Sequence, residues 1–249
     1  MVIDVNCWCD TPQGGQSLAD LERTAEECAR WRVRECWVGS FDALFDLDPV
    51  AVCVRTIARR CNVFPGRIRL FGTVNPTLGG IRDQLEELHR AGFQGIRLYP
   101  PAHGYDLADP RFRRLQAFAE KMELVLQLVC RIEDPRTQHP PGKWPELDLA
   151  SLANIRLARP LVLLNCPLTR LPDPVRANRL VFVDTAWLEG LGPLDRAVEA
   201  LGTYERLLFG SYWPVFPLAS AALKLRETTL APEAVRCVAA ENARRLVPP

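Results

Sequence analysis

The stretch GIRLYPPAHGYDLADPRF, residues 95–112, contains the features that decide the fold. Its first part, Gly95–Tyr99, is a short apolar run with the length of a buried strand. A polar, proline-containing segment follows, and an amphipathic stretch of helical periodicity begins at Pro110. The stretch therefore predicts one strand, one loop and one covering helix, which is the repeating unit of a parallel α/β fold.

The same alternation of apolar runs and amphipathic stretches continues in both directions along the chain. Eight apolar runs are present, which is the number of strands that closes a barrel. These runs are Val2–Trp8, Glu35–Ser40, Ile68–Val74, Gly95–Tyr99, Leu124–Cys130, Leu161–Cys166, Leu180–Asp184 and Leu207–Ser211. The expected covering helices are Ser17–Trp31, Ile81–Ala91, Pro110–Met122, Leu191–Leu201, Leu218–Glu227 and Pro232–Leu246. We therefore predict a single (β/α)8 TIM-barrel domain over residues 1–249.

The composition narrows the class of partner. Apolar residues make up 48% and charged residues 24% of the 249 residues, as in ordinary globular proteins, and the formal net charge is only +1. So small a charge gives no strong attraction to nucleic acid or to a membrane surface, and the expected partner is a small molecule, with a homo-oligomer left open. The nine cysteines lie mostly in apolar or amphipathic stretches and no leader is evident, so we expect reduced thiols and a cytoplasmic location.

Residues 95–112 resemble the fourth-strand segment of the family-2 amidohydrolases, a group of metal-dependent hydrolases and acyl decarboxylases. Further matches are spread over most of the chain: IDVNCW at Ile3–Trp8, RLFGTVNP at Arg69–Pro76, RIEDPRTQHP at Arg131–Pro140 and RLLFGSYWP at Arg206–Pro214. The resemblance implies an amidohydrolase-like barrel and, for an active member, hydrolysis or decarboxylation.

The resemblance also indicates where a metal would bind. The family has Asp-x-His-x-His on its first strand and a metal-binding aspartate after its last, but this chain has Asn6, Trp8 and Tyr212 at those places. A catalytic zinc needs about three protein ligands. The chain has only three histidines, at positions 89, 103 and 139. We therefore predict no metal cofactor, with one alternative left open: a zinc-type mononuclear site built from His103 or His139 with a carboxylate.

Barrel active sites form at the C-terminal ends of the strands, so the candidate residues are those that follow the apolar runs. The catalytic candidates are groups that can transfer a proton, namely Asp184, Glu133, His139 and His103. His103 is equally compatible with a loop histidine that hydrogen-bonds to the backbone. The ligand-binding candidates are Arg97, Tyr99, Arg131, Asn6, Trp8, Asn165 and Tyr212.

Two groups of these candidates have a specific expected role. Arg97 and Arg131 have the planar fork that matches a carboxylate, and the alternative is that they pair with Glu133, Asp134 or Asp184 inside the fold. The large aromatic side chains of Trp8 and Tyr212 would either close the barrel mouth or line a cleft for a flat organic molecule.

The sequence thus predicts a divergent amidohydrolase-like barrel that binds a small organic ligand, carboxylated if the arginines contact it, at its C-terminal face. If active, it is a hydrolase or a carbon–carbon lyase that does not use the family's metal site. The alternative is a pseudoenzyme that acts as a binding or regulatory partner.

Overall fold

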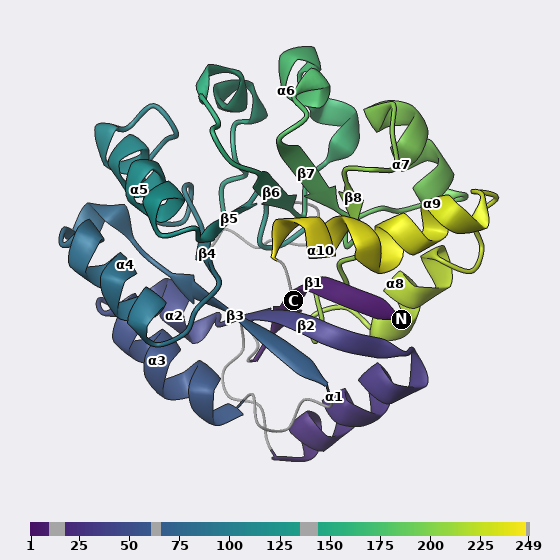
Figure 1. Cartoon of the computed structure of the whole chain (residues 1–249), viewed down its shortest axis with the longest axis horizontal. Helices are drawn as coiled ribbons and strands as arrows, with labels where there is room; N and C mark the ends of the chain where they lie inside the picture. The colour runs from purple at the N-terminus through teal and green to yellow at the C-terminus, as the bar shows by residue number, and fades with distance from the viewer. Residues whose placement is uncertain (10–17, 61–65, 135–143, 248–249) are drawn as a thin grey trace.

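Eight parallel strands, each hydrogen-bonded to its neighbours in chain order, form the barrel of this computed structural model (Figure 1). They are β1 (Val2–Trp8), β2 (Val33–Gly39), β3 (Arg67–Thr73), β4 (Gly95–Leu98), β5 (Val125–Val129), β6 (Leu161–Leu164), β7 (Val181–Asp184) and β8 (Leu207–Leu208). The structure describes residues 1–9, 18–60, 66–134 and 144–247, without the side chains of 18–23 and 56–60. Every predicted run contains a strand, and the predicted (β/α)8 fold class is confirmed.

Helices surround the barrel and cover its outer face (Figure 1). They are α1 (Leu18–Arg30), α2 (Asp42–Phe45), α3 (Pro49–Arg60), α4 (Ile81–Arg90), α5 (Pro110–Lys121), α6 (Asp173–Ala177), α7 (Pro193–Leu201), α8 (Leu218–Lys224), α9 (Pro232–Arg236) and α10 (Asn242–Leu246). Shorter turns are η2 (Pro76–Leu78), η3 (Leu149–Asn154), η4 (Leu168–Arg170) and the π-helical η5 (Cys237–Glu241). Each predicted amphipathic stretch contains a helix, whereas α2, α3 and α6 were not predicted.

The apolar core has two layers, and β1 contributes to both. Val5 and Trp8 pack inside the barrel, whereas Cys7 packs in the layer between the barrel and the helices. A register irregularity between Asp4 and Cys7 interrupts the alternation of the strand. At the N-terminal end of the barrel, Ala243 of α10 joins the interior cluster, so this helix closes that end. The strands present their last residues at the opposite, C-terminal end.

The barrel closes between β1 and the residues after the very short β8. The amide of Val5 donates to the Phe209 carbonyl at 3.0 Å, and the amide of Tyr212 donates to the Asn6 carbonyl at 2.9 Å. The Asp4 carboxylate also accepts a 3.0 Å hydrogen bond from the amide of Ser211. We refer to these contacts as the closing seam; they place residues 209–212 beside the end of β1.

The described ranges contain neither a candidate membrane-spanning helix nor a disulfide. Within the described ranges, no helix is both long enough and apolar enough to cross a membrane. Eight cysteines in those ranges are buried and form no disulfide, in agreement with the predicted reduced thiols.

Candidate functional site at the C-terminal end of the barrel

A carboxylate and two amides form a buried hydrogen-bond network at the barrel mouth. The Asn6 side-chain Nδ2 donates to Oδ2 of Asp184 at 2.7 Å and to Oδ1 of Asn165 at 2.8 Å. The backbone amide of Asn165 donates to Oδ1 of Asp184 at 2.8 Å. Each of the three side chains is at most 1% exposed. Residues after β6 and at the end of β7 are thus fixed against β1 by polar contacts across the barrel.

The environment of Asp184 tunes its protonation. Burial raises the pKa of Asp184 to about 6, and the hydrogen bonds from Asn6 and Asn165 oppose this rise because they favour the charged form. The ammonium group of Lys224 donates to the carbonyls of Thr185 and Ala186 at 2.8 and 2.9 Å. Desolvation lowers the pKa of Lys224 to about 8, and the nearby charge of Asp184 opposes this shift. Both groups therefore titrate within reach of neutral pH.

Aromatic rings surround this network. Trp8 donates from Nε1 to Oδ1 of Asn6 at 3.1 Å, and its ring stacks on Phe41 with centroids 3.7 Å apart. The Tyr212 ring lies edge-on to both, at 5.9 Å from Trp8 and 6.0 Å from Phe41. The Tyr212 hydroxyl donates to the carbonyl of Ile132, and all three rings are fully buried. The polar network thus lies in a dry, aromatic environment.

Two residues of this site have left-handed backbone conformations. Asn165 has φ of 55° and Tyr212 has φ of 61°, and each follows closely after a barrel strand. Side chains larger than glycine adopt this region at a cost, which for Tyr212 is of order 1–3 kcal/mol. Such strain persists only where surrounding contacts enforce it, and here those contacts direct the Asn165 and Tyr212 side chains into the mouth.

Arg97 occupies the barrel interior beneath this site. Its Nε donates to Oε1 of Gln127 at 2.8 Å, and Nη1 donates to the Cys7 carbonyl at 2.9 Å. Its Nη2 donates to the carbonyl of Trp37 at 3.2 Å, and the guanidinium carbon lies 4.4 Å from the Trp8 ring centroid. The side chain is 0% exposed. Because protein groups already bond its nitrogens, Arg97 is not proposed to bind a ligand carboxylate. Its partners are carbonyl oxygens rather than the carboxylates of the alternative prediction.

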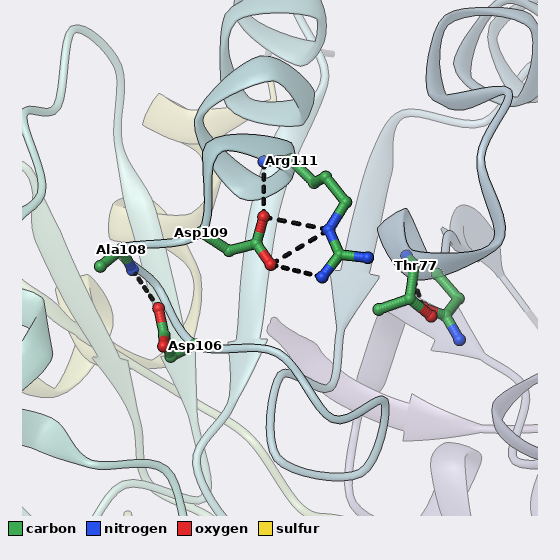
Figure 2. A network of polar contacts seen from close by, with 6 residues as sticks. Thr77, Asp106, Ala108, Asp109 and Arg111 are labelled. Carbon is green, nitrogen blue, oxygen red and sulfur yellow. Dashed lines mark hydrogen bonds and ion pairs between the residues drawn. The ribbon is translucent and has the colours of Figure 1, made fainter.

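The loop after β4 carries two further candidates. The ring of His103 lies edge-on to Tyr99, and His103 Nε2 lies 3.2 Å from the Leu44 carbonyl oxygen. Burial lowers the pKa of His103, so the neutral imidazole is favoured. Figure 2 shows the far end of this loop, where the Asp109 carboxylate accepts from the amide of Arg111 at 2.7 Å and pairs with its guanidinium at 2.6 Å. This cap fixes the start of α5 and with it the loop.

Arg131 lies at the rim, beside a cavity of about 250 Å³. Its guanidinium lies over the Trp187 ring at 5.0 Å, and its Nη2 lies 3.1 Å from a carboxylate oxygen of Glu146. Nε of Arg131 and Nε1 of Trp187 are buried and have no hydrogen-bond partner among the described residues. The cavity also contacts Cys166 and Arg196. Two unsatisfied donors beside a cavity favour an acceptor-rich, anionic ligand.

The structure therefore brings some of the predicted site residues together and separates others. The mouth contains Asn6, Trp8, Tyr99, His103, Asn165, Asp184 and Tyr212, with Arg131 at the rim and Arg97 below. Glu133 is partly buried and close enough to Tyr212 for its charge to help raise the pKa of that phenol, after the larger effect of burial. His139 lies outside the described residues.

Sequence reasoning did not select Phe41, Trp187 or Lys224 for the site. Phe41 comes two residues after β2 and Trp187 three residues after β7, so both follow strand ends as the chosen candidates do. The same signal therefore applied to Phe41 and Trp187, but they were not chosen because they carry no group that transfers a proton or an obvious ligand-binding charge. Lys224 is on α8, and only the folded structure shows that its ammonium group reaches the residues after β7.

The chain thus forms a (β/α)8 barrel with a polar, aromatic-covered mouth, and solved structures of similar fold are found. A 5-carboxyvanillate decarboxylase from Novosphingobium aromaticivorans has a TM-score of 0.72 at 12% identity, over 99% of this chain and 95% of that one. A dihydroxybenzoic acid decarboxylase from a Polaromonas species has a TM-score of 0.70 at 13% identity, over 98% and 96%. A protein from Staphylococcus aureus assigned as an amidohydrolase has a TM-score of 0.72 at 12% identity, over 98% of both chains.

These likenesses confirm the fold that the sequence resemblance implied. At such identities they are likenesses of fold alone. No family model matches the chain, and no curated protein matches it by sequence.

The neighbours correct one prediction. We expected no metal cofactor, but the carboxyvanillate and dihydroxybenzoic acid decarboxylases were both crystallised with bound manganese. In the described part of this chain, no three His, Cys, Asp or Glu side chains are grouped to hold a metal ion. The oxygens of Asp184 accept hydrogen bonds from N–H groups of Asn6 and Asn165, which is an amide environment. The described residues alone thus do not supply the set of ligands that a metal ion needs.

Proposed function

We propose that this barrel binds a small aromatic carboxylate at its C-terminal face and acts as a decarboxylase. The observation that carries the proposal is the Arg131–Trp187 pair. Both residues line a cavity of about 250 Å³, and Nε of Arg131 and Nε1 of Trp187 are buried without a hydrogen-bond partner among the described residues. A planar guanidinium stacked on an indole is suited to hold a carboxylate beside a flat ring. The neighbouring decarboxylases bind 4-hydroxy-3-methoxy-5-nitrobenzoic acid and 2-nitroresorcinol, which are flat and polar in the same way.

The dry mouth favours decarboxylation over hydrolysis. Trp8, Phe41 and Tyr212 are fully buried, so bulk water does not reach the network beneath them. Loss of CO2 consumes no water, and a low-dielectric environment destabilises the reacting carboxylate, whose carbon and oxygens leave as a neutral molecule. Hydrolysis would need a bound water as a reactant. The aromatic cover therefore supports the lyase reaction first and the hydrolase reaction second.

The reaction needs one proton. The carbon–carbon bond to the carboxylate breaks, its electron pair stays on the ring carbon, and that carbon takes a proton as CO2 leaves. Asp184, with a pKa of about 6, is the described group at the mouth proposed to supply it, and a neutral His103 could pass it on only after taking up a proton itself. Glu133 and His139 remain predictions for the same role.

Arg131 also constrains the substrate. A cation that held the departing carboxylate would stabilise the reactant more than the transition state and would slow the reaction. The group that Arg131 anchors is therefore a second acidic group. The proposed substrate is an aromatic acid with two anionic groups, one at the rim and one near the mouth.

Calorimetric titration with isophthalate and benzoate, with and without MnCl2, tests this proposal. We expect isophthalate to bind more tightly than benzoate, and Arg131→Met to weaken isophthalate about 10- to 100-fold, because a charge-assisted hydrogen bond contributes about 1.5–3 kcal/mol. Trp187→Phe keeps an aromatic ring for stacking, although a smaller one, and removes the N–H donor. Arg170→Met is the matched control, since Arg170 pairs with the same Glu146 at 2.5 Å but does not line the cavity.

Turnover is read from NMR spectra in D2O, where decarboxylation places deuterium on the ring carbon that lost CO2. Failure of both acids to bind, with or without manganese, would sink the proposal, and so would unchanged binding in Arg131→Met.

A binding protein without catalysis is the second candidate function. Two observations on Asp184 favour it: both carboxylate oxygens already accept hydrogen bonds, and the residue is only 1% exposed. Both leave little room for contact between Asp184 and a substrate. Tight binding of isophthalate that depends on Arg131, without deuterated product at any manganese concentration, would select this candidate.

A further inference from the structure

A second cavity, of about 550 Å³, lies at the opposite end of the barrel. It is formed by the N-terminal end of β1, the C-terminal ends of α1 and α8, and one side of α9, η5 and α10. Figure 1 shows the start of β1 beside α8 and α9, close to the yellow C-terminal helices. Its volume is in the range of sites for small organic molecules, and it is separate from the mouth.

The charges around this cavity are unbalanced. Four arginines line it and only one carboxylate does; the carboxylate is Glu241, 3.9 Å from Arg236. Arg32, Arg226 and Arg244 form no ion pair with any described residue. The ends of α1 and α8 each contribute roughly half a negative charge, which leaves an excess of roughly two positive charges.

Within the described ranges, the contacts of Arg226 and Arg244 are weak ones. Nη2 of Arg244 lies 3.1 Å from the Met1 sulfur, which is only a weak acceptor. The guanidinium of Arg226 lies over the Trp31 ring at 4.7 Å. The Nε1 of Trp31 donates to Glu27 at 3.1 Å, and this bond fixes the orientation of the indole. The cavity thus offers free cationic donors next to an oriented aromatic ring.

The remaining lining is apolar and includes Val2, Leu225 and Val235. The π-helical turn η5 has a structural explanation of its own, because the Val238 carbonyl turns out of the helix to accept from the Phe209 amide at 2.9 Å.

We propose that this cavity is a second ligand site, which binds a small organic anion with a flat apolar body. The arginines would hold the anionic group, and Trp31 with the apolar wall would hold the ring. This site is independent of the proposed reaction at the mouth, because none of its lining residues belongs to the mouth or the rim.

Calorimetry of the full chain with naphthalene-2-sulfonate, a flat permanent anion, tests the site. We expect saturable binding of one molecule per chain, and at least 10-fold weaker binding in the double variant Arg226→Met/Arg244→Met. Neutral naphthalene-2-sulfonamide should bind at least 10-fold more weakly, because it lacks the charge that the arginines bind. Inorganic phosphate should also bind at least 10-fold more weakly, because it lacks the ring that contacts Trp31 and the apolar wall. Both substituted arginines are exposed, so we expect the variant to fold, and circular dichroism verifies this.

Two controls separate this site from the others. Arg82→Met/Arg114→Met removes two exposed arginines beside another cavity, of about 390 Å³, and should leave binding unchanged. Arg131→Met alters only the rim of the mouth and should also leave it unchanged. Unchanged binding in Arg226→Met/Arg244→Met, equal binding of the sulfonamide or of phosphate, loss only in Arg131→Met, or no saturable binding would each overturn the proposal.

Discussion

The two ends of the barrel treat charge in opposite ways. At the C-terminal end, Asp184 and Arg97 are buried and their polar atoms are bonded to amides and carbonyls of the barrel. At the N-terminal end, Arg226 and Arg244 are exposed, and a ring and a thioether are their contacts. The buried charges at the C-terminal end therefore contribute to folding, whereas the exposed arginines at the N-terminal end are available to bind a ligand. Substitutions should therefore cost stability at one end and ligand affinity at the other.

The largest expected effect follows from Arg97→Met, which tests whether the mouth end depends on its buried charge. Removal of the guanidinium leaves the carbonyls of Cys7 and Trp37 and the side chain of Gln127 without their donor. We expect the free energy of unfolding to fall by about 3 kcal/mol or more, measured by urea denaturation. The exposed Arg114→Met is the control. A loss below about 1 kcal/mol would show that the interior does not depend on this cation.

The next effect concerns the pH dependence that Asp184 gives to stability. Burial raises its pKa from 3.8 to about 6 in the folded protein, so below about pH 4 the carboxyl is protonated in both states. Between pH 4 and 6 the unfolded chain releases this proton first, and the folded state loses stability as pH rises. We expect Asp184→Asn to gain about 3 kcal/mol relative to the parent between pH 4 and 7, from two pKa units.

Urea denaturation at pH 4 and pH 7 measures that difference. The comparison between the two pH values matters, because Asp184→Asn also places a second amide nitrogen or oxygen against Asn6 at every pH. The exposed Asp83→Asn serves as the control and should follow the parent protein. Parallel curves for the parent and Asp184→Asn would contradict the raised pKa.

A smaller effect is expected for Tyr212→Phe, which keeps the ring of the aromatic cover and removes its hydroxyl. The Ile132 carbonyl loses its donor in a dry environment, which costs about 1–2 kcal/mol. The thermal midpoint should fall by roughly 2–6 °C, measured by calorimetry. Tyr204→Phe is matched to it, because the Tyr204 hydroxyl makes no hydrogen bond within the described ranges. Equal midpoints in the two variants would show that the Tyr212 hydroxyl does not stabilise the folded protein.

The smallest effect on stability is expected at the other end of the barrel. Arg244→Met should change the free energy of unfolding by no more than about 0.5 kcal/mol, as for an exposed side chain without an ion pair. Relief of repulsion among the neighbouring arginines could even raise stability at low salt, which urea denaturation at two salt concentrations would measure. A loss above about 1 kcal/mol would show that Arg244 stabilises the folded protein, as the buried charges at the C-terminal end do.

Sequence periodicity predicted the architecture because each strand of a closed barrel is apolar on both faces. All eight runs contain strands, with boundaries shifted by a few residues. The helix α3 (PVAVCVRTIARR) was missed because Val50–Val54 is an unbroken apolar run rich in β-branched valine, without the polar face that marks an amphipathic helix.

The site was predictable only as a set of residues. The rule that strand ends meet at one face placed Asn6, Asn165 and Asp184 together correctly. The same rule selected Arg97, although its long side chain turns down into the barrel, where Gly39 leaves it room: a Cβ there would lie 2.8 Å from Nη1. Which side chains turn toward the mouth depends on packing, and one sequence does not reveal that.

The closing seam has a consequence for how the molecule is made. The contact between Asp4 and Ser211 joins residues 207 positions apart, and β8 itself is only two residues long. On the ribosome, the first strand emerges long before its last neighbour exists, so its outer edge stays exposed during most of synthesis. Contacts of such separation form slowly, and barrel closure is accordingly expected to be the final, rate-limiting event of folding.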